Sequence, residues 1–292
     1  MPILIPVEYN NKKYPTWINS EISEVPGHFD VEQLEIKGKF SLHTEYAYKK
    51  RSFNSAILQN LDQIKAAHKN NVPQLWKNQL WSQQFTKFIF NLIKHNNPEV
   101  IEIHPPFEDY CETITEFVEI YSVFENLILS YYPNTKILLE NRSGTLYRGS
   151  DFLISDCDDL IALLETIEAK NLTLRLVVDF PQLFTAVGGI RKINKVKLED
   201  IFDKLNEIRN QIYGFHLWGK KISKSGRLIS HAGDLNTTFR NKALKQYFLK
   251  KLYTLFDDSK PRYFVPEVNT RTEDLISILN DLKDIGFKFK NN

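Results

Sequence analysis

Five short apolar runs of this 292-residue sequence each end in a carboxylate or an imidazole side chain. Carboxylates and imidazoles together suit Zn²⁺, Mn²⁺ or Mg²⁺, and the geometry of a site decides among these ions. Several carboxylates cannot share one buried volume uncompensated, and a divalent cation is the simplest compensation. We therefore predict that these side chains form a site for one or two divalent ions. In chain order they are His104, Glu140, Asp179, His216 and Glu267.

Strand and helix patterns alternate along the chain around these residues. Strict alternation of apolar strands and helices indicates a parallel sheet with both faces covered. In a parallel α/β barrel the active site is built at the C-terminal ends of several strands, which is where the five side chains stand. The expected fold class is therefore α/β, a (β/α)8 TIM barrel. Strands are expected at 100–104, 136–140, 173–179, 212–217 and 263–267, and helices at 109–131, 156–169, 198–211, 239–256 and 271–284.

The N-terminal third of the sequence is less regular. Residues 1–30 are rich in proline and predict an extension or arm lying on the main body. One or two strands are expected near 34–48, followed by helices at 52–69 and 80–95. Since a TIM barrel takes roughly 250 residues, we predict a single barrel domain at 31–292 after the N-terminal extension.

The composition narrows the class of protein. The net charge of +2 neither demands nor excludes a polyanionic partner. The two cysteines, Cys111 and Cys157, form no CxxC motif and predict reduced thiols and a cytoplasmic location. No apolar run approaches the ~20 residues of a membrane helix, so we expect no membrane partner. The sequence has no nucleophile elbow and no P-loop, and it gives no indication of the oligomeric state.

Several residues near the strand ends are candidates for binding a substrate. Arg142 could hold a carboxylate or a phosphate through its planar guanidinium, and Lys220 could neutralise an anionic substrate. Trp218 could stack on a sugar or a base, with a packing role as the alternative. The run His231-Ala-Gly-Asp234 lies late in a long loop, where its glycine would let an ion or a phosphate approach closely. A plain turn is the alternative for this run.

The strand-end set resembles the xylose-isomerase-like barrel superfamily and, within it, the class-two apurinic endonucleases. The second resemblance covers roughly residues 100–270 and implies a cluster of metal ions that activates water and holds a DNA phosphodiester. That family has a histidine three residues after its aspartate, where this chain has Gln182, and an aspartate two residues before its loop histidine, where this chain has Ile229. The matching motifs are His104-Pro, Glu140-Asn-Arg-Ser-Gly, Val178-Asp179-Phe, Phe215-His216-Leu, His231-Ala-Gly-Asp and Pro266-Glu267.

Three functions remain open at this point. The first is hydrolysis of phosphodiester bonds in nucleic acid, with the phosphate backbone as partner and with His104 and His231 completing a second metal position. The alternative is a single-metal sugar isomerase or epimerase, in which Glu140 and Glu267 would be the catalytic acid and base. The third is a barrel that serves only as a binding module. The candidate substrate-binding residues are Arg142, Gln182, Trp218, Lys220 and Asp234.

Overall fold

The computed structural model describes residues 1–144, 150–222, 228–239 and 241–290. The chain divides into two compact units, and each is described by itself. Two strands, β2 (Ile22–Gly27) and β8 (Arg175–Asp179), contain residues of both units. Unit 1 consists of Met1–Ser23 and Val177–Asn292, and unit 2 consists of Glu24–Leu176.

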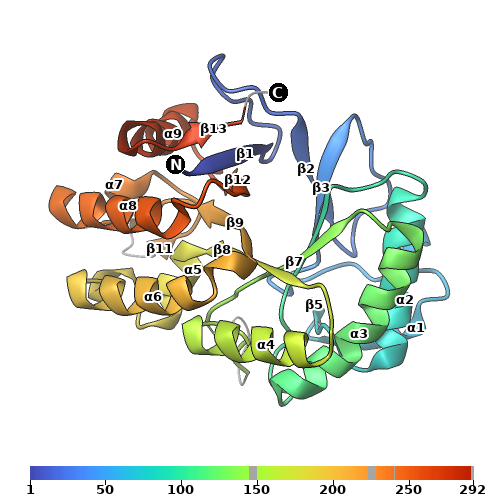
Figure 1. Cartoon of the computed structure of the whole chain (residues 1–292). Helices are drawn as coiled ribbons and strands as arrows, with labels where there is room; N and C mark the ends of the chain where they lie inside the picture. The colour runs from blue at the N-terminus through green and yellow to red at the C-terminus, as the bar shows by residue number, and fades with distance from the viewer. Residues whose placement is uncertain (145–149, 223–227, 240, 291–292) are drawn as a thin grey trace. The chain divides into compact units, whose positions relative to one another are not determined.

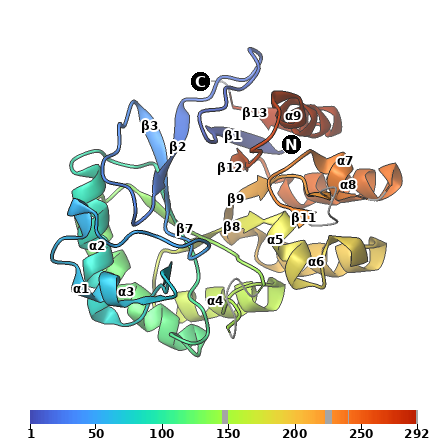
Figure 2. The ribbon, with the colours of Figure 1, turned by 180° about the vertical axis from the view of Figure 1, so that it is seen from behind.

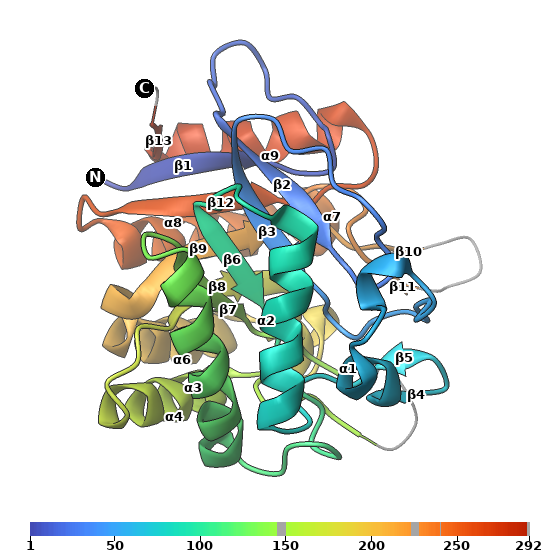
Figure 3. The same cartoon turned by 90° about the vertical axis from the view of Figure 1, so that its right-hand side faces the viewer.

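Unit 2 combines parallel strands with helices packed beside them. Besides β2, its strands in the sheet are β3 (Lys39–Thr44), β6 (Val100–Ile103) and β7 (Lys136–Glu140). Its helices are α1 (Asp62–Ala66), α2 (Gln79–Ile93), α3 (Ile114–Tyr131) and α4 (Cys157–Ala169), with a 3-10 turn η1 (Ala56–Leu58) and a hairpin of β4 (His68–Lys69) and β5 (Val72–Pro73). β3 pairs in parallel with β6, and β6 with β7. Figure 1 labels β2, β3 and β7 among the strands of this unit. Figure 3 shows α2 and α3 side by side.

An aromatic core lies beneath α2 and α3. The Asn78 side chain caps α2 by accepting a hydrogen bond from the Trp81 backbone N–H, which satisfies one of the donors left open at a helix start. The ring of Trp76 lies 5.1 Å from that of Trp81 and 5.4 Å from those of Phe117 and Phe124, measured between centroids. Such packing fixes the orientation of the Trp76 indole, which matters for the site described below.

Unit 1 is built in the same way. Its strands in the sheet are β1 (Ile3–Glu8), β9 (Ile212–Leu217), β12 (Pro261–Pro266) and β13 (Lys288–Phe289). Its helices are α5 (Phe180–Ala186), α6 (Lys195–Glu207), α7 (Leu235–Thr238), α8 (Lys242–Phe256) and α9 (Thr272–Ile285), with 3-10 turns η2 (Ile190–Lys192) and η3 (Arg209–Gln211) and a hairpin of β10 (Lys221–Ile222) and β11 (Leu228–Ile229). β1 pairs in parallel with β12, and β12 with β9. Figure 2 shows α6, α8 and α9 following one another beside these strands.

The strand order defines the fold class. In unit 1 the hydrogen-bonded order is β8-β9-β12-β1-β2, and in unit 2 it is β2-β3-β6-β7-β8. Neighbours in this order are also successive strands of the sheet along the chain, apart from the pair β12 and β1, and helices lie in most of the connections. This is the strand order of a TIM barrel. The predicted fold class, an α/β protein with a (β/α)8 TIM barrel, is confirmed.

The largest differences from the predicted elements lie near the N-terminus. Residues 1–30 contain β1 and β2, and the predicted domain boundary at residue 30 stays a prediction. The helix expected at 52–69 is replaced by η1 and α1, because Asn60 between them has φ 65°, in the left-handed region that an α-helix cannot continue through. In the described part of the chain, no helix is long and apolar enough to cross a membrane.

Candidate metal-binding sites

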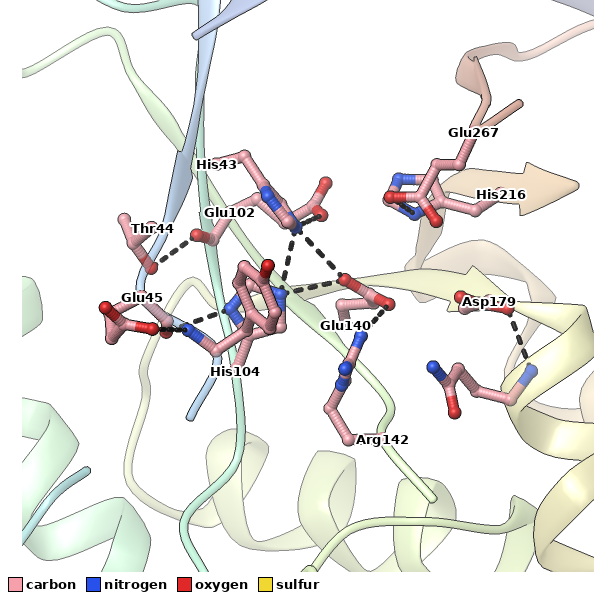
Figure 4. Close-up of polar contacts among 12 residues, drawn as sticks. His43, Thr44, Glu45, Glu102, His104, Glu140, Arg142, Asp179, His216 and Glu267 are labelled. Carbon is pink, nitrogen blue, oxygen red and sulfur yellow. Dashed lines mark hydrogen bonds and ion pairs between the residues drawn. The ribbon is translucent and has the colours of Figure 1, made fainter. Parts of the chain in front are cut away.

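Four buried donor side chains converge at the strand ends of unit 2. They are His43 on β3, Glu102 on β6, His104 directly after β6, and Glu140 at the end of β7. One ligand atom from each lies within 4.8 Å of the others, and we call these residues the unit 2 cluster. Figure 4 shows the His43 and His104 rings turned toward the Glu140 carboxylate.

The spacing of the donor atoms in the unit 2 cluster suits one small cation. Nε2 of His104 lies 2.8 Å from Oε2 of Glu140 and 3.1 Å from Nε2 of His43. Nε2 of His43 lies 3.4 Å from the same Glu140 oxygen and 3.3 Å from Oε1 of Glu102. Ligand atoms bound tetrahedrally to zinc at 2.0–2.1 Å are themselves roughly 3.3 Å apart. Three of these four separations are close to the spacing that a tetrahedral ion requires, and the fourth is shorter.

Contacts outside the cluster fix the orientation of His104. Its Nδ1 lies 3.2 Å from the backbone carbonyl oxygen of Glu45, and it can bond this oxygen only by donating a hydrogen. The lone pair of the ring is then on Nε2, which faces Glu140. A metal-ligating histidine typically donates its other ring N–H in this way. The indole N–H of Trp76 also donates to the backbone carbonyl of His104, at 2.7 Å.

The protonation states in the unit 2 cluster follow from its burial and its charges. Burial acts to lower the pKa of His43, but the carboxylates around it, Glu24 first among them, outweigh burial and raise the pKa to about 10. Burial lowers the pKa of His104 to about 4. Burial acts to raise the pKa of Glu140, but the two neighbouring histidines and the charge of Arg142 outweigh burial and hold it well below the usual range. His43 is therefore protonated at neutral pH, and a metal ion that binds its ring would have to displace that proton.

Arg142, predicted to bind a substrate, lies against Glu140. Its guanidinium nitrogen NH1 is 3.4 Å from Oε1 of Glu140, and its guanidinium carbon is 5.2 Å from the centroid of the Tyr46 ring. The side chain is buried. The structure thus gives Arg142 a role in compensating the Glu140 charge, while substrate binding stays a prediction.

Three donor side chains converge at the strand ends of unit 1. They are Asp179 at the end of β8, His216 on β9 and Glu267 directly after β12, and one ligand atom from each lies within 4.8 Å of the others. We call these residues the unit 1 cluster, and all three are buried. Nδ1 of His216 is 3.5 Å from Oε1 of Glu267 (Figure 4). Two carboxylates and one imidazole form a donor set typical of Zn²⁺ or Mn²⁺ sites.

Both oxygens of Asp179 accept hydrogen bonds from within unit 1. Oδ1 accepts from the backbone N–H of Gln182 at 2.9 Å, so Asp179 also caps the start of α5. Oδ2 accepts from the indole N–H of Trp218, also at 2.9 Å. Trp218 is fully buried, and its indole lies beside the candidate ligand Asp179. Its predicted contact with a substrate stays a prediction.

His231 lies beside Glu267 in a loop that is held by direct backbone contact. Its Nδ1 is 3.4 Å from Oε2 of Glu267, and its ring stacks on Trp218 with 4.2 Å between centroids. A Cβ at Gly219 would lie 2.4 Å from the carbonyl carbon of Gly233, so the two backbones touch. Only glycine allows this approach, and the contact holds the segment that carries His231.

Asp234 and Lys220, also predicted to bind a substrate, make structural contacts, and for these two residues and Gln182 substrate binding stays a prediction. Asp234 caps α7 by accepting from the Thr237 backbone N–H, and it also accepts from the hydroxyl of Ser277 at 2.6 Å. Nζ of Lys220 donates to the backbone carbonyl of Pro181 at 3.3 Å and to the Thr185 hydroxyl at 2.5 Å. Burial lowers the pKa of Lys220, and the nearby Asp179 opposes this shift.

The predicted metal ligands fall into both clusters. His104 and Glu140 belong to unit 2, whereas Asp179, His216, Glu267 and the neighbouring His231 belong to unit 1. That Glu140 shares an ion with the residues of unit 1 stays a prediction. His43 and Glu102 were missed. The run Phe40-Ser-Leu-His43 has the same apolar strand ending in a histidine, and Glu102 stands two residues before His104, on the same face of a strand.

No protein-family model and no curated protein matches this chain in sequence. Among solved structures, the family 2 AP endonuclease from Brucella melitensis is 8% identical and has a TM-score of 0.50, over 93% of this chain and 94% of its own. A xylose isomerase domain protein from Planctomyces limnophilus is 12% identical over 97% of this chain and 96% of its own, with a TM-score of 0.45. One from Salmonella typhimurium is 9% identical over 83% and 74%, with a TM-score of 0.43. At these identities the likeness concerns the TIM-barrel fold alone.

Proposed function

We propose that the protein is a divalent-metal-dependent hydrolase that cleaves phosphodiester bonds in nucleic acid. The observation that supports this proposal best is the number of buried donors, four in the unit 2 cluster and three in the unit 1 cluster. A single tetrahedral ion takes four ligands, so these donors can serve two ions. Sites with two ions are common in enzymes that hydrolyse phosphodiesters. The barrel fold, which an AP endonuclease also has, is compatible with this chemistry.

The donor sets suggest which ion each unit prefers. His43, His104 and Glu140 would hold the ion of unit 2, with Glu102 as the fourth donor, and two imidazoles favour zinc there. The ion of unit 1 would be held by the two carboxylates and one imidazole of its cluster, a set that also suits manganese. Bound ions lower the pKa of a coordinated water toward neutrality and stabilise negative charge on a phosphate.

Neighbouring residues orient the candidate metal ligands. The carbonyl of Glu45 fixes the tautomer of His104, and Arg142 holds the Glu140 carboxylate. The N–H groups of Gln182 and Trp218 orient Asp179. As substrate contacts we retain Arg142 for the phosphate and Lys220 for the charge of the backbone, both as proposals.

A cleavage assay tests the proposal. The purified full chain is incubated with Zn²⁺, Mn²⁺ or Mg²⁺ and with three substrates: a duplex carrying an abasic site, a single strand and a supercoiled plasmid. We expect cleavage of at least one substrate, abolished by a chelator and by Glu140→Gln. Glu125→Gln is the matched control, because Glu125 is a buried carboxylate of α3 in the same unit. The proposal would be wrong if protein that holds two ions, as confirmed by elemental analysis, cleaves none of these substrates.

The sugar isomerase is the second candidate, and the donor set of unit 1 favours it. Two carboxylates and a histidine would hold one ion, and Glu140 and Glu267 would transfer the proton as base and acid. In an isomerase of this kind the two imidazoles of the unit 2 cluster, His43 and His104, would have no catalytic role. Incorporation of solvent deuterium into a panel of ketoses would identify the isomerase. A chain that retains no divalent ion at all would instead support the non-catalytic binding module.

A further inference from the structure

We propose that Trp218 is a positioning residue for the metal site of unit 1, holding two candidate ligands at once. This inference rests on the metal site in the proposed function, not on the nucleic-acid substrate. A fully buried tryptophan could serve packing alone, and a phenylalanine would then do as well. The contacts of Trp218 require both parts of its side chain, the N–H and the flat ring.

The N–H of Trp218 fixes the carboxylate of Asp179. The bond from Nε1 to Oδ2 is 2.9 Å long, and Oδ1 accepts from the Gln182 backbone N–H at 2.9 Å. With both oxygens bound to neutral donors, the carboxylate plane cannot rotate without losing a hydrogen bond. Each oxygen still has a second lone pair for a cation.

The ring of Trp218 fixes His231 and through it reaches Glu267. The two rings stack with 4.2 Å between centroids and an angle of 22°. Nδ1 of His231 lies 3.2 Å from the backbone carbonyl oxygen of Glu267 and 3.4 Å from its Oε2. His231 stands at a left-handed φ of 54°, so its backbone alone costs energy to hold. The stacked indole therefore helps to keep the imidazole at the carboxylate.

Three fully buried tryptophans of the chain form a natural comparison series. Trp218 donates its indole N–H to the side chain of a candidate ligand, Asp179. Trp76 donates to the backbone carbonyl of a candidate ligand, His104. The indole nitrogen of Trp81 has no hydrogen-bond partner in the described part of the chain. Replacement by phenylalanine removes an N–H and keeps a ring at all three positions, but only at Trp218 does it release a ligand side chain.

The expected effect is a selective loss of metal affinity. Changes in the partners that orient metal ligands typically lower affinity 10–100-fold. We expect Trp218→Phe to lower the affinity for one of two ions by about 10–100-fold and to leave the affinity for the other unchanged. Because the freed carboxylate changes the ligand field, the visible absorption of Co²⁺ in the weakened site should shift as well. Trp81→Phe should change neither affinity nor spectrum.

The experiment uses the metal-free full chain and its Trp218→Phe, Trp76→Phe and Trp81→Phe variants. Zn²⁺ and Mn²⁺ affinities are measured by competition with a chromophoric chelator, Co²⁺ spectra by titration, and metal-free stability by urea unfolding. Unchanged affinities in Trp218→Phe, or an equal loss in Trp81→Phe, would overturn the inference. If Trp218→Phe does not fold, benzothienylalanine at position 218 keeps the two-ring shape and replaces the N–H by sulfur. If the wild-type protein binds no ion, both the metal site and the role of Trp218 are overturned. If it binds ions but cleaves no substrate, only the nucleic-acid function is overturned.

Discussion

The two clusters differ in the partners that hold their carboxylates. In the unit 2 cluster the donors contact one another, with Nε2 of His104 2.8 Å from Glu140 and 3.1 Å from His43. In the unit 1 cluster the carboxylate of Asp179 is held by neutral N–H groups from outside the cluster. Charged partners thus hold Glu140 in the unit 2 cluster, whereas neutral donors orient Asp179 in the unit 1 cluster.

This difference predicts how each cluster responds to damage. Buried charges that compensate one another leave an uncompensated charge when one member is removed, which costs several kcal/mol. Ligands oriented by neutral donors lose only their orientation when a donor is removed. Changes in the unit 2 cluster should therefore affect both stability and metal binding, whereas changes around the unit 1 cluster should affect metal binding more selectively.

Glu140→Gln should have the largest effect, because Glu140 balances the protonated His43 and Arg142. Both of these partners are buried. Breaking a buried ion pair typically costs about 3–5 kcal/mol, so we expect a loss of that order in the free energy of unfolding in urea at pH 7. The variant should also lose one of two bound ions.

The control for this prediction is Glu125→Gln. Glu125 accepts hydrogen bonds from the Tyr121 hydroxyl and, at 2.7 Å, from the Thr173 backbone N–H. Its replacement should lower stability without changing the number of bound ions. Two ions retained in Glu140→Gln would show that the unit 2 cluster is a charge network and not a metal site.

His104→Ala and His231→Ala should differ in their effect on metal affinity. His104 is fully buried, with Nε2 directed at two other donors, so its removal should cost more than about 100-fold in affinity for one ion. The His231 side chain is 23% exposed and approaches Glu267 at the edge of the unit 1 cluster. Removing a residue that only orients a ligand should lower metal affinity about 10-fold. Equal losses in a chelator competition would instead make His231 a ligand.

The strand ends could be predicted from the sequence because they depend on local patterns. An apolar run that ends in a polar residue is visible within five or six residues, and Glu140, Asp179 and His216 are indeed buried ends or near-ends of strands. The TIM-barrel fold follows from the alternation of such runs with helices. These features need no knowledge of which strands pair.

The partners of the strand ends could not be predicted in the same way. His43 meets His104 because β3 pairs with β6, a contact between residues 59 positions apart at Ser41 and Val100. The bond between Trp218 and Asp179 likewise joins residues 39 positions apart. The strand β1 was obscured by its internal Pro6, since proline is rare within paired strands. Long-range pairing, not local propensity, decides each of these cases.

One aspartate in each unit should respond to acid, and the two should change folding stability in opposite directions. Burial acts to raise the pKa of Asp258 in unit 1, but hydrogen bonds from Arg262 outweigh it and lower the pKa. A lowered folded pKa stabilises the fold above the unfolded pKa of about 3.9, and this stabilisation is lost as pH falls through the folded pKa. In unit 2, burial raises the pKa of Asp159. Its ionisation opposes folding, and this penalty disappears as pH falls through the raised pKa.

Hydrogen exchange followed by mass spectrometry can separate these two effects. As pH falls below about 3.9, Asp258→Asn should reduce the loss of protection around residues 253–266. As pH falls toward about 3.9 from above, Asp159→Asn should reduce the gain around residues 153–164. Protection that falls in parallel in both segments, with and without the substitutions, would contradict this assignment of the two aspartates.

Asp234→Ala should have the smallest effect, and it tests a residue that the sequence places in the substrate site. Its carboxylate is directed at the start of α7 and at Ser277. Loss of such a cap costs about 1 kcal/mol, and Asp156→Ala, which removes the cap of α4 in unit 2, should cost a similar amount in urea unfolding. Cleavage by Asp234→Ala should equal that of Asp156→Ala. A fall in kcat/KM confined to Asp234→Ala would restore its role in substrate binding, because the matched loss of a cap cannot explain it.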